Sequence, residues 1–152
     1  MIKKLFHIAD LHFRTYNRHN ECKEVCNKFL NEVKFYIEDN NLSFEECRIV
    51  IAGDIVHQKI KNKKIFITGG AGSLGKALVN RLVIIAGNHD LLENNKDRLD
   101  SLTPIIEIMN NPYVNYMTES KCYLDENIVW CCYSIFEENA RPDIDACRKE
   151  YG

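Results

Sequence analysis

Residues 48–54, Arg-Ile-Val-Ile-Ala-Gly-Asp, decide the fold of this 152-residue chain. The apolar run from Arg48 to Ala52 has no polar alternation, which is typical of a strand buried on both faces of a parallel sheet. It stops abruptly at Gly53-Asp54. This change predicts that a buried strand ends here and delivers a carboxylate to the edge of the sheet.

The same pattern occurs at two other places in the chain. The apolar run 4–9 ends in Asp10-Leu11-His12, and the run 83–86 ends in Gly87-Asn88-His89-Asp90. We expect His7, inside the first run, to be packed. Because the carboxyl ends of parallel strands meet at one edge of a sheet, the polar residues after the three runs should lie together.

Helical and strand-like patterns fill the rest of the chain. A helix is expected from Asn20 to about Asp39, where apolar residues recur at helical spacing, and another near 104–109. The stripe of the first helix is expected to comprise Val25, Phe29, Val33, Tyr36 and Ile37. Strand-like runs follow at 113–117, 121–124 and 128–133, with a turn at 125–127. We therefore expect an α/β fold, with parallel strands and crossover helices followed by a strand-rich tail.

Composition narrows the class of protein. The chain is 45% apolar and 28% charged with a net charge of −2, as in a globular domain. No run approaches the roughly 18 apolar residues of a membrane span, and charged residues come too early for a signal peptide. The seven cysteines form no Cys-x-x-Cys pair, so we expect reduced thiols and no thiolate zinc site. We expect a cytoplasmic protein, or one in the host cytosol or nucleoid if it is viral, with no membrane partner.

The polar residues after the three strands carry the chemistry. They are Asp10, His12, Asp54, Asn88, His89 and Asp90. Carboxylate, imidazole and amide groups together suit Mn²⁺, Fe or Zn²⁺ bound by mixed oxygen and nitrogen ligands. Asp54 has two oxygens and follows the central strand, so it is placed to bridge two ions. Two ions about 3.5–4 Å apart would support attack of water on phosphorus.

These motifs resemble those of the calcineurin-like metallophosphoesterases, most closely the SbcD-type DNA repair nucleases. The residues around them support the resemblance, namely His-Ile-Ala-Asp-Leu-His-Phe-Arg and Ile-Ala-Gly-Asp-Ile-Val-His-Gln-Lys. The resemblance covers residues 1–60 and 83–152. It implies that Asp10 and His12 bind a first metal, that Asp54 bridges, and that Asn88 binds a second. It implies His89 as the acid that protonates the leaving oxygen or steadies the transition state, oriented by Asp90.

The same resemblance implies a cofactor and partners. The two divalent ions would be Mn²⁺, and the substrate would be DNA, whose phosphates Arg14 and Arg18 are placed to meet. A coiled-coil ATPase subunit and a homodimer are the implied assemblies. Family members complete their metal pair with later histidines, whereas the five histidines here stand at 7, 12, 19, 57 and 89. We therefore expect the N-terminal part only of a metallophosphoesterase sandwich, with weak metal binding and impaired nuclease activity.

A second motif interrupts this pattern at residues 63–82. Its strand-like start and Thr-Gly-x-x-Gly-x-x-Gly spacing, with Gly69, Gly72 and Gly75, resemble the NAD-binding start of nucleotide-sugar epimerases and dehydratases. Residues 74–82 would form its helix. No loop or free acidic residue follows for the ribose, and no Tyr-x-x-x-Lys pair exists, so NAD is not expected. We interpret 63–82 as a Rossmann-like insertion or replacement within one incomplete domain, 1–152. A nucleotide-binding fragment and an inactive chimera remain the alternatives.

Overall fold

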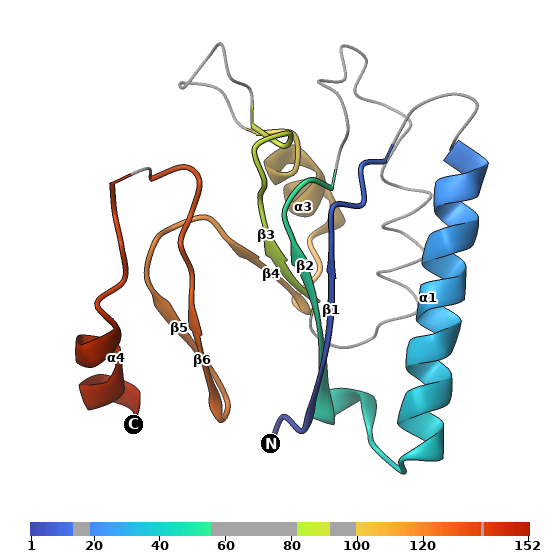
Figure 1. Ribbon diagram of the computed structural model, residues 1–152, viewed down its shortest axis with the longest axis horizontal. Coiled ribbons are helices and arrows are strands. Elements are labelled where there is room, and N and C mark those ends of the chain that lie inside the picture. Colours follow the sequence, from blue (N-terminus) through green and yellow to red (C-terminus); the bar gives the residue numbers. More distant parts are fainter. Residues whose placement is uncertain (14–18, 56–81, 92–99, 138) are drawn as a thin grey trace.

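The computed structural model describes residues 1–13, 19–55, 82–91, 100–137 and 139–152 (Figure 1). In these ranges the chain forms ten elements. The strands are β1 (Lys4–Ala9), β2 (Cys47–Ala52), β3 (Leu82–Ile85), β4 (Val114–Met117), β5 (Cys122–Asp125) and β6 (Ile128–Cys131). The helices are α1 (His19–Asp39), the short 3-10 helix η2 (Phe44–Glu46), α3 (Thr103–Met109) and α4 (Ile144–Tyr151).

Four strands form a parallel sheet in the order β1-β2-β3-β4. Ala9 pairs with Ala52, and Ala52 with Ile85, so the first three strands end at one level. Five of the six residues of β2 are buried, as expected for a strand covered on both faces. This arrangement confirms the predicted α/β class and puts the polar residues that follow the strands at one edge of the sheet.

One face of the sheet is covered by helices, with α1 running alongside it (Figure 1). The buried residues of α1 are Cys26, Leu30, Val33 and Ile37, which pack with Ile49 and Ile51 of β2 and Ile84 of β3. Val25 and Tyr36, both expected in the buried stripe, are exposed; the buried stripe runs through Cys26 and Leu30 together with Val33 and Ile37. Since β1–α1–β2 and β3–α3–β4 each join parallel neighbours, right-handed crossovers place both helices on the same face.

The opposite face is covered by the antiparallel hairpin β5–β6. Val50, Val83 and Met117 from the sheet form a second buried cluster with Cys132, which follows β6. The predicted turn at 125–127 is confirmed, because Asp125 pairs with Ile128. The molecule is thus layered, with helices, a parallel sheet and a small hairpin in that order.

A buried ion pair fastens this hairpin to the sheet. The Arg48 side chain is fully buried, and its Nε and Nη2 donate hydrogen bonds of 2.7 and 2.8 Å to the two carboxylate oxygens of Asp125. Burial opposes the charge of Arg48, yet Asp125 and Glu126 outweigh it and raise the pKa of the guanidinium above its ordinary value. Trp130 Nε1 donates to the same carboxylate at 3.3 Å. The start of β2 and the hairpin turn are therefore held together at one point.

Four further sequence expectations are wrong or incomplete. His7 is exposed, because it lies on the uncovered face of the edge strand β1. The tail is not only strand-rich, since it ends in α4. Cys122 and Cys147 form a disulfide, so not all thiols are reduced. Leu82, the last residue of the helix expected over 74–82, begins β3 instead, and the rest of 63–82 lies outside the described residues, where the insertion remains a prediction.

We predict that Asp125→Ala lowers the free energy of unfolding by about 3 kcal/mol, because it leaves the buried Arg48 guanidinium without its main partner. Urea unfolding followed by circular dichroism measures the change. The matched control is Arg148→Gln, which removes an arginine whose ion pair with Asp145 joins two exposed side chains. A midpoint for Asp125→Ala as close to wild type as that of the control would contradict the prediction.

Candidate metal centre

The pairing of the strands continues into the loops that follow them. Gly53 N donates to Ile85 O at 2.9 Å, and Asp10 N donates to Gly53 O at 3.3 Å. His12 N then donates to Asp54 O at 2.9 Å. The loops after β1, β2 and β3 are therefore in register at their first residues, and their side chains start from neighbouring backbone positions.

Several of these loop residues have backbone angles in the left-handed region. The φ angles are 55° at Asp10, 44° at His12 and 49° at Asp54, with 77° at Gly53. Such angles are uncommon for residues other than glycine, although aspartate and histidine tolerate them better than most. Strained positions of this kind cluster at functional sites, where surrounding contacts hold them. At this edge, the interstrand hydrogen bonds of the loops supply those contacts.

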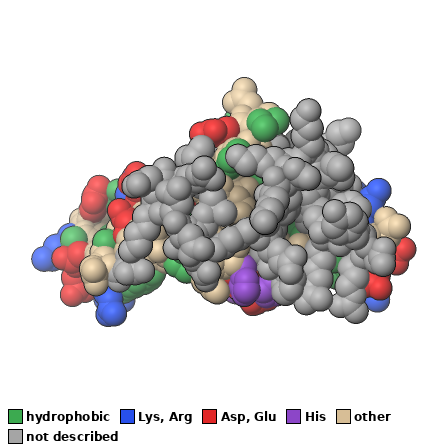
Figure 2. Space-filling view, turned by 90° about the horizontal axis from the view of Figure 1, so that it is seen from above, with side chains coloured by type: hydrophobic (Ala, Val, Ile, Leu, Met, Phe, Trp, Pro, Cys, Tyr) green, Lys and Arg blue, Asp and Glu red, His purple; other side chains and the backbone are tan. Residues whose placement is uncertain are grey.

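Three side chains from the three loops meet at this edge. One potential ligand atom from each of His12, Asp54 and His89 lies within 4.8 Å of the others. His12 Nε2 is 3.9 Å from Asp54 Oδ2, and the two imidazole rings are edge to face with centroids 5.0 Å apart. Asp10 adds a carboxylate, with Oδ1 at 3.7 Å from His12 Nε2. Figure 2, seen from above this edge, shows histidine side chains reaching the surface.

This donor set fits a divalent cation. Two imidazoles and two carboxylates supply mixed nitrogen and oxygen ligands, the combination that suits Mn²⁺, Fe or Zn²⁺. His12 and Asp54 are half-buried, whereas His89 is exposed. The structure thus brings together Asp10, His12, Asp54 and His89, four of the six residues singled out in the sequence. His89, expected to act on the proton rather than on the metal, lies within the donor group.

Asp54 is held by a close approach of the loops after β2 and β3. Its Oδ1 accepts a hydrogen bond of 2.9 Å from His89 N. A Cβ atom on Gly87 would collide with both the carboxylate and the backbone nitrogen of Asp54. Position 87 therefore requires glycine, because any side chain there would collide with Asp54. Sequence reasoning overlooked this role, although the glycine directly before Asn88 was its signal.

Asp90 is fully buried beneath the centre. Its Oδ2 accepts hydrogen bonds from Gly87 N at 2.9 Å and Ile55 N at 3.2 Å, so one carboxylate oxygen joins the loops after β2 and β3. Its carbonyl oxygen accepts from Ser101 N at 3.0 Å. These contacts make Asp90 a positioning residue for the backbone of the centre. The predicted orientation of His89 by Asp90 remains a prediction.

The other candidate residues differ in where they lie. Asn88 is exposed in the loop after β3, and its role as a ligand remains a prediction. Arg14, Arg18, Gly69, Gly72 and Gly75 lie outside the described residues.

Comparison with known proteins assigns a family to this arrangement. The chain belongs to the calcineurin-like phosphoesterases, whose family model matches residues 3–144. Over 141 residues it is 36% identical to the uncharacterized protein R555 of Acanthamoeba polyphaga mimivirus. This match covers 91% of the chain but 10% of the viral protein, so the chain spans about a tenth of that relative. Within the described residues, none of the helices has the length and apolar character needed to cross a membrane.

We predict that Gly87→Ala weakens metal binding, because the new methyl group must displace Asp54. The measurement is the rise in melting temperature caused by Mn²⁺, which reports binding to the folded state. We expect a smaller rise than in wild type, with circular dichroism confirming that the variant is folded. An unchanged rise in a folded Gly87→Ala protein would contradict the proposed contact.

Proposed function

We propose that the chain is the metal-binding part of a metal-dependent phosphodiesterase, a DNA nuclease of the SbcD type that uses Mn²⁺. The observation that carries the proposal is the convergence of His12, Asp54 and His89, with Asp10 beside them, at the carboxyl edge of the parallel sheet. Ligands bind at this edge in open α/β sheets. The sequence surrounding Asp10 and Asp54 supports the nuclease type within the family.

Each residue of the centre has its own proposed role in phosphodiester hydrolysis. Divalent ions bound here would supply a Lewis acid for the phosphoryl oxygens and would lower the pKa of a bound water. Asp10 and His12 would hold one ion, Asp54 would be shared with a second, and Asn88 would complete the second site. His89, exposed at the rim, gives a proton to the leaving oxygen. Asp90 fixes the loops that carry these groups.

The remaining parts of the proposal concern substrate and assembly. DNA phosphates would meet Arg14 and Arg18, and a coiled-coil ATPase subunit and a second copy of the chain would be partners, in the cytoplasm or in the cytosol of a host. Because no histidine follows His89, we expect this chain alone to bind Mn²⁺ weakly and to cleave DNA slowly. Residues 63–82 are proposed to be a Rossmann-like segment that does not bind NAD.

We predict that Mn²⁺ raises the melting temperature of the wild-type chain and that Asp54→Ala abolishes the rise. The physical reason is that Asp54 is the carboxylate at the centre of the donor group. Asp39→Asn, at the exposed end of α1, is the matched control and should keep the wild-type rise. A rise that survives Asp54→Ala would contradict the proposed site, and a rise caused by NADH would favour the nucleotide-binding alternative.

We predict that His89→Ala loses cleavage of a labelled blunt-ended DNA duplex but keeps a Mn²⁺-dependent rise, because Asp10, His12 and Asp54 remain as donors. Protein in excess over DNA makes slow cleavage measurable in a single turnover. His7→Ala, at the exposed face of β1, is the control and should cleave like wild type. Loss of the rise in His89→Ala would make His89 a metal ligand instead of an acid. DNA that stays intact with wild type, despite a Mn²⁺-dependent rise, would refute the nuclease proposal and leave the metal site standing.

A further inference from the structure

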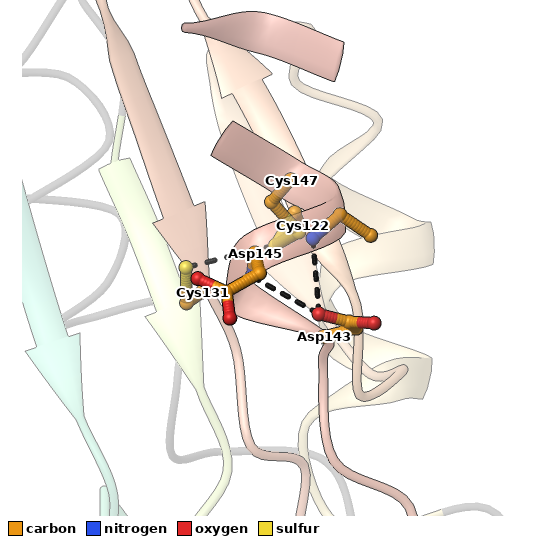
Figure 3. The surroundings of a disulfide bond; sticks show 6 residues. Cys122, Cys131, Asp143, Asp145 and Cys147 are labelled. Carbon is orange, nitrogen blue, oxygen red and sulfur yellow. Dashed lines mark hydrogen bonds between the residues drawn. A yellow bond between two sulfur atoms is a disulfide. The ribbon is translucent and has the colours of Figure 1, made fainter. Parts of the chain in front are cut away.

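Three cysteines from three elements meet at the outer side of the hairpin (Figure 3). Cys122 of β5 forms a disulfide with Cys147 of α4. Cys131 of β6 is a free, exposed thiol, and its Sγ lies 3.6 Å from that of Cys122. Cys122 therefore has two sulfur neighbours, one bonded to it and one in contact with it.

The strand register makes a bond between Cys122 and Cys131 geometrically accessible as well. The two residues are directly opposite in the antiparallel pair. The neighbouring hydrogen bond, from Cys132 N to Lys121 O at 3.0 Å, places them at a position without mutual backbone hydrogen bonds. Opposite residues at such positions have Cα atoms about 4.5 Å apart, within the range that a disulfide spans.

We infer that this cluster is a thiol–disulfide exchange site in which Cys131 and Cys147 compete for Cys122. The Cys131 thiolate attacks Cys122 Sγ, the bond between Cys131 and Cys122 forms, and the bond between Cys122 and Cys147 breaks. Cys147 leaves as a thiolate and takes up the proton that Cys131 has lost to water. One disulfide replaces another, so the step needs neither an oxidant nor a reductant.

The exchange controls how α4 is attached. None of the residues of α4 is buried, and the disulfide joins the helix covalently to β5. Asp143 caps the helix by accepting hydrogen bonds of 3.0 Å from Asp145 N and Ala146 N. The disulfide between Cys122 and Cys147 holds α4 on the hairpin. The disulfide between Cys122 and Cys131 would join β5 to β6 and release α4. Figure 1 places α4 beyond the hairpin, across the sheet from α1, so the site is separate from the metal centre.

The first experiment maps the disulfides of the oxidised chain. The chain is oxidised with glutathione disulfide, freed of it, incubated at pH 8.5 and alkylated with N-ethylmaleimide. Cleavage after Lys121, Glu126, Glu137 and Arg148 separates Cys122, Cys131 and Cys147 into different peptides, and fragmentation by mass spectrometry distinguishes label on Cys131 from label on the adjacent Cys132. We expect label on both Cys131 and Cys147 in wild type, and loss of the label on Cys147 in Cys131→Ser.

The mapping also has outcomes that overturn the inference. If Cys131 but not Cys147 is labelled in wild type at every incubation time, the disulfide between Cys122 and Cys147 does not exchange. Label on all three cysteines after oxidation would mean that no disulfide forms. Zinc bound in equal amount to the purified chain and released on alkylation would make the cluster a metal site.

The second experiment tests the release of α4 and uses two matched variants. Within the cluster, Cys147→Ser leaves the bond inside the hairpin as the possible disulfide, whereas Cys131→Ser leaves the bond to α4. We expect trypsin to cleave after Arg148 and Lys149 faster in oxidised Cys147→Ser than in oxidised Cys131→Ser. Equal rates of cleavage would overturn the proposed control of α4, whatever the disulfide map shows.

Discussion

The parallel register of β1, β2 and β3 is the constraint on which the candidate centre depends. It places Ala9, Ala52 and Ile85 side by side, and the polar groups of the centre come from the loops that follow these residues. A shift of one residue in any strand would turn its side chains to the other face and move its loop out of line. The burial of β2 on both faces, between α1 and the hairpin, fixes this register.

The backbone of the centre is strained, and contacts between the loops hold it in place. Left-handed backbone at Asp10, His12 and Asp54 is unfavourable, and such positions cost on the order of 1–3 kcal/mol each. Gly87 admits Asp54 by having no side chain, and the buried Asp90 carboxylate holds the loops after β2 and β3. The polar edge is therefore pre-organised by backbone contacts, which fix the positions from which the side chains of His12 and His89 extend.

The features that follow local patterns could be predicted from the sequence. The apolar runs predicted the bounds of β1 and β2 almost to the residue, because strands buried in a sheet consist mainly of apolar residues. The convergence of His12, Asp54 and His89 followed from the rule that parallel strands end at one edge. Residues 63–82 form a pattern of their own, and the described part of the chain does not include them, apart from Leu82.

Other features depend on contacts between distant residues, which a sequence pattern does not reveal. The disulfide of Cys122 and Cys147 spans 25 residues, and the ion pair of Arg48 and Asp125 spans 77. α4 has no buried residues, so no apolar stripe in the sequence predicts this helix. His7 is exposed because β1 lies at the edge of the sheet. These features belong to the way the hairpin and the tail are attached, and they were found only in the assembled structure.

The most direct test of the account is paramagnetic broadening by Mn²⁺ in the amide spectrum of the ¹⁵N-labelled chain. Mn²⁺ bound at the carboxyl edge of the sheet should broaden the amides of His12, Asp54 and His89 first, at substoichiometric metal. The amides of β5, β6 and α4 should stay sharp under the same conditions. Broadening spread over the acidic surface, or centred on the hairpin, would contradict a metal centre at the ends of β1, β2 and β3.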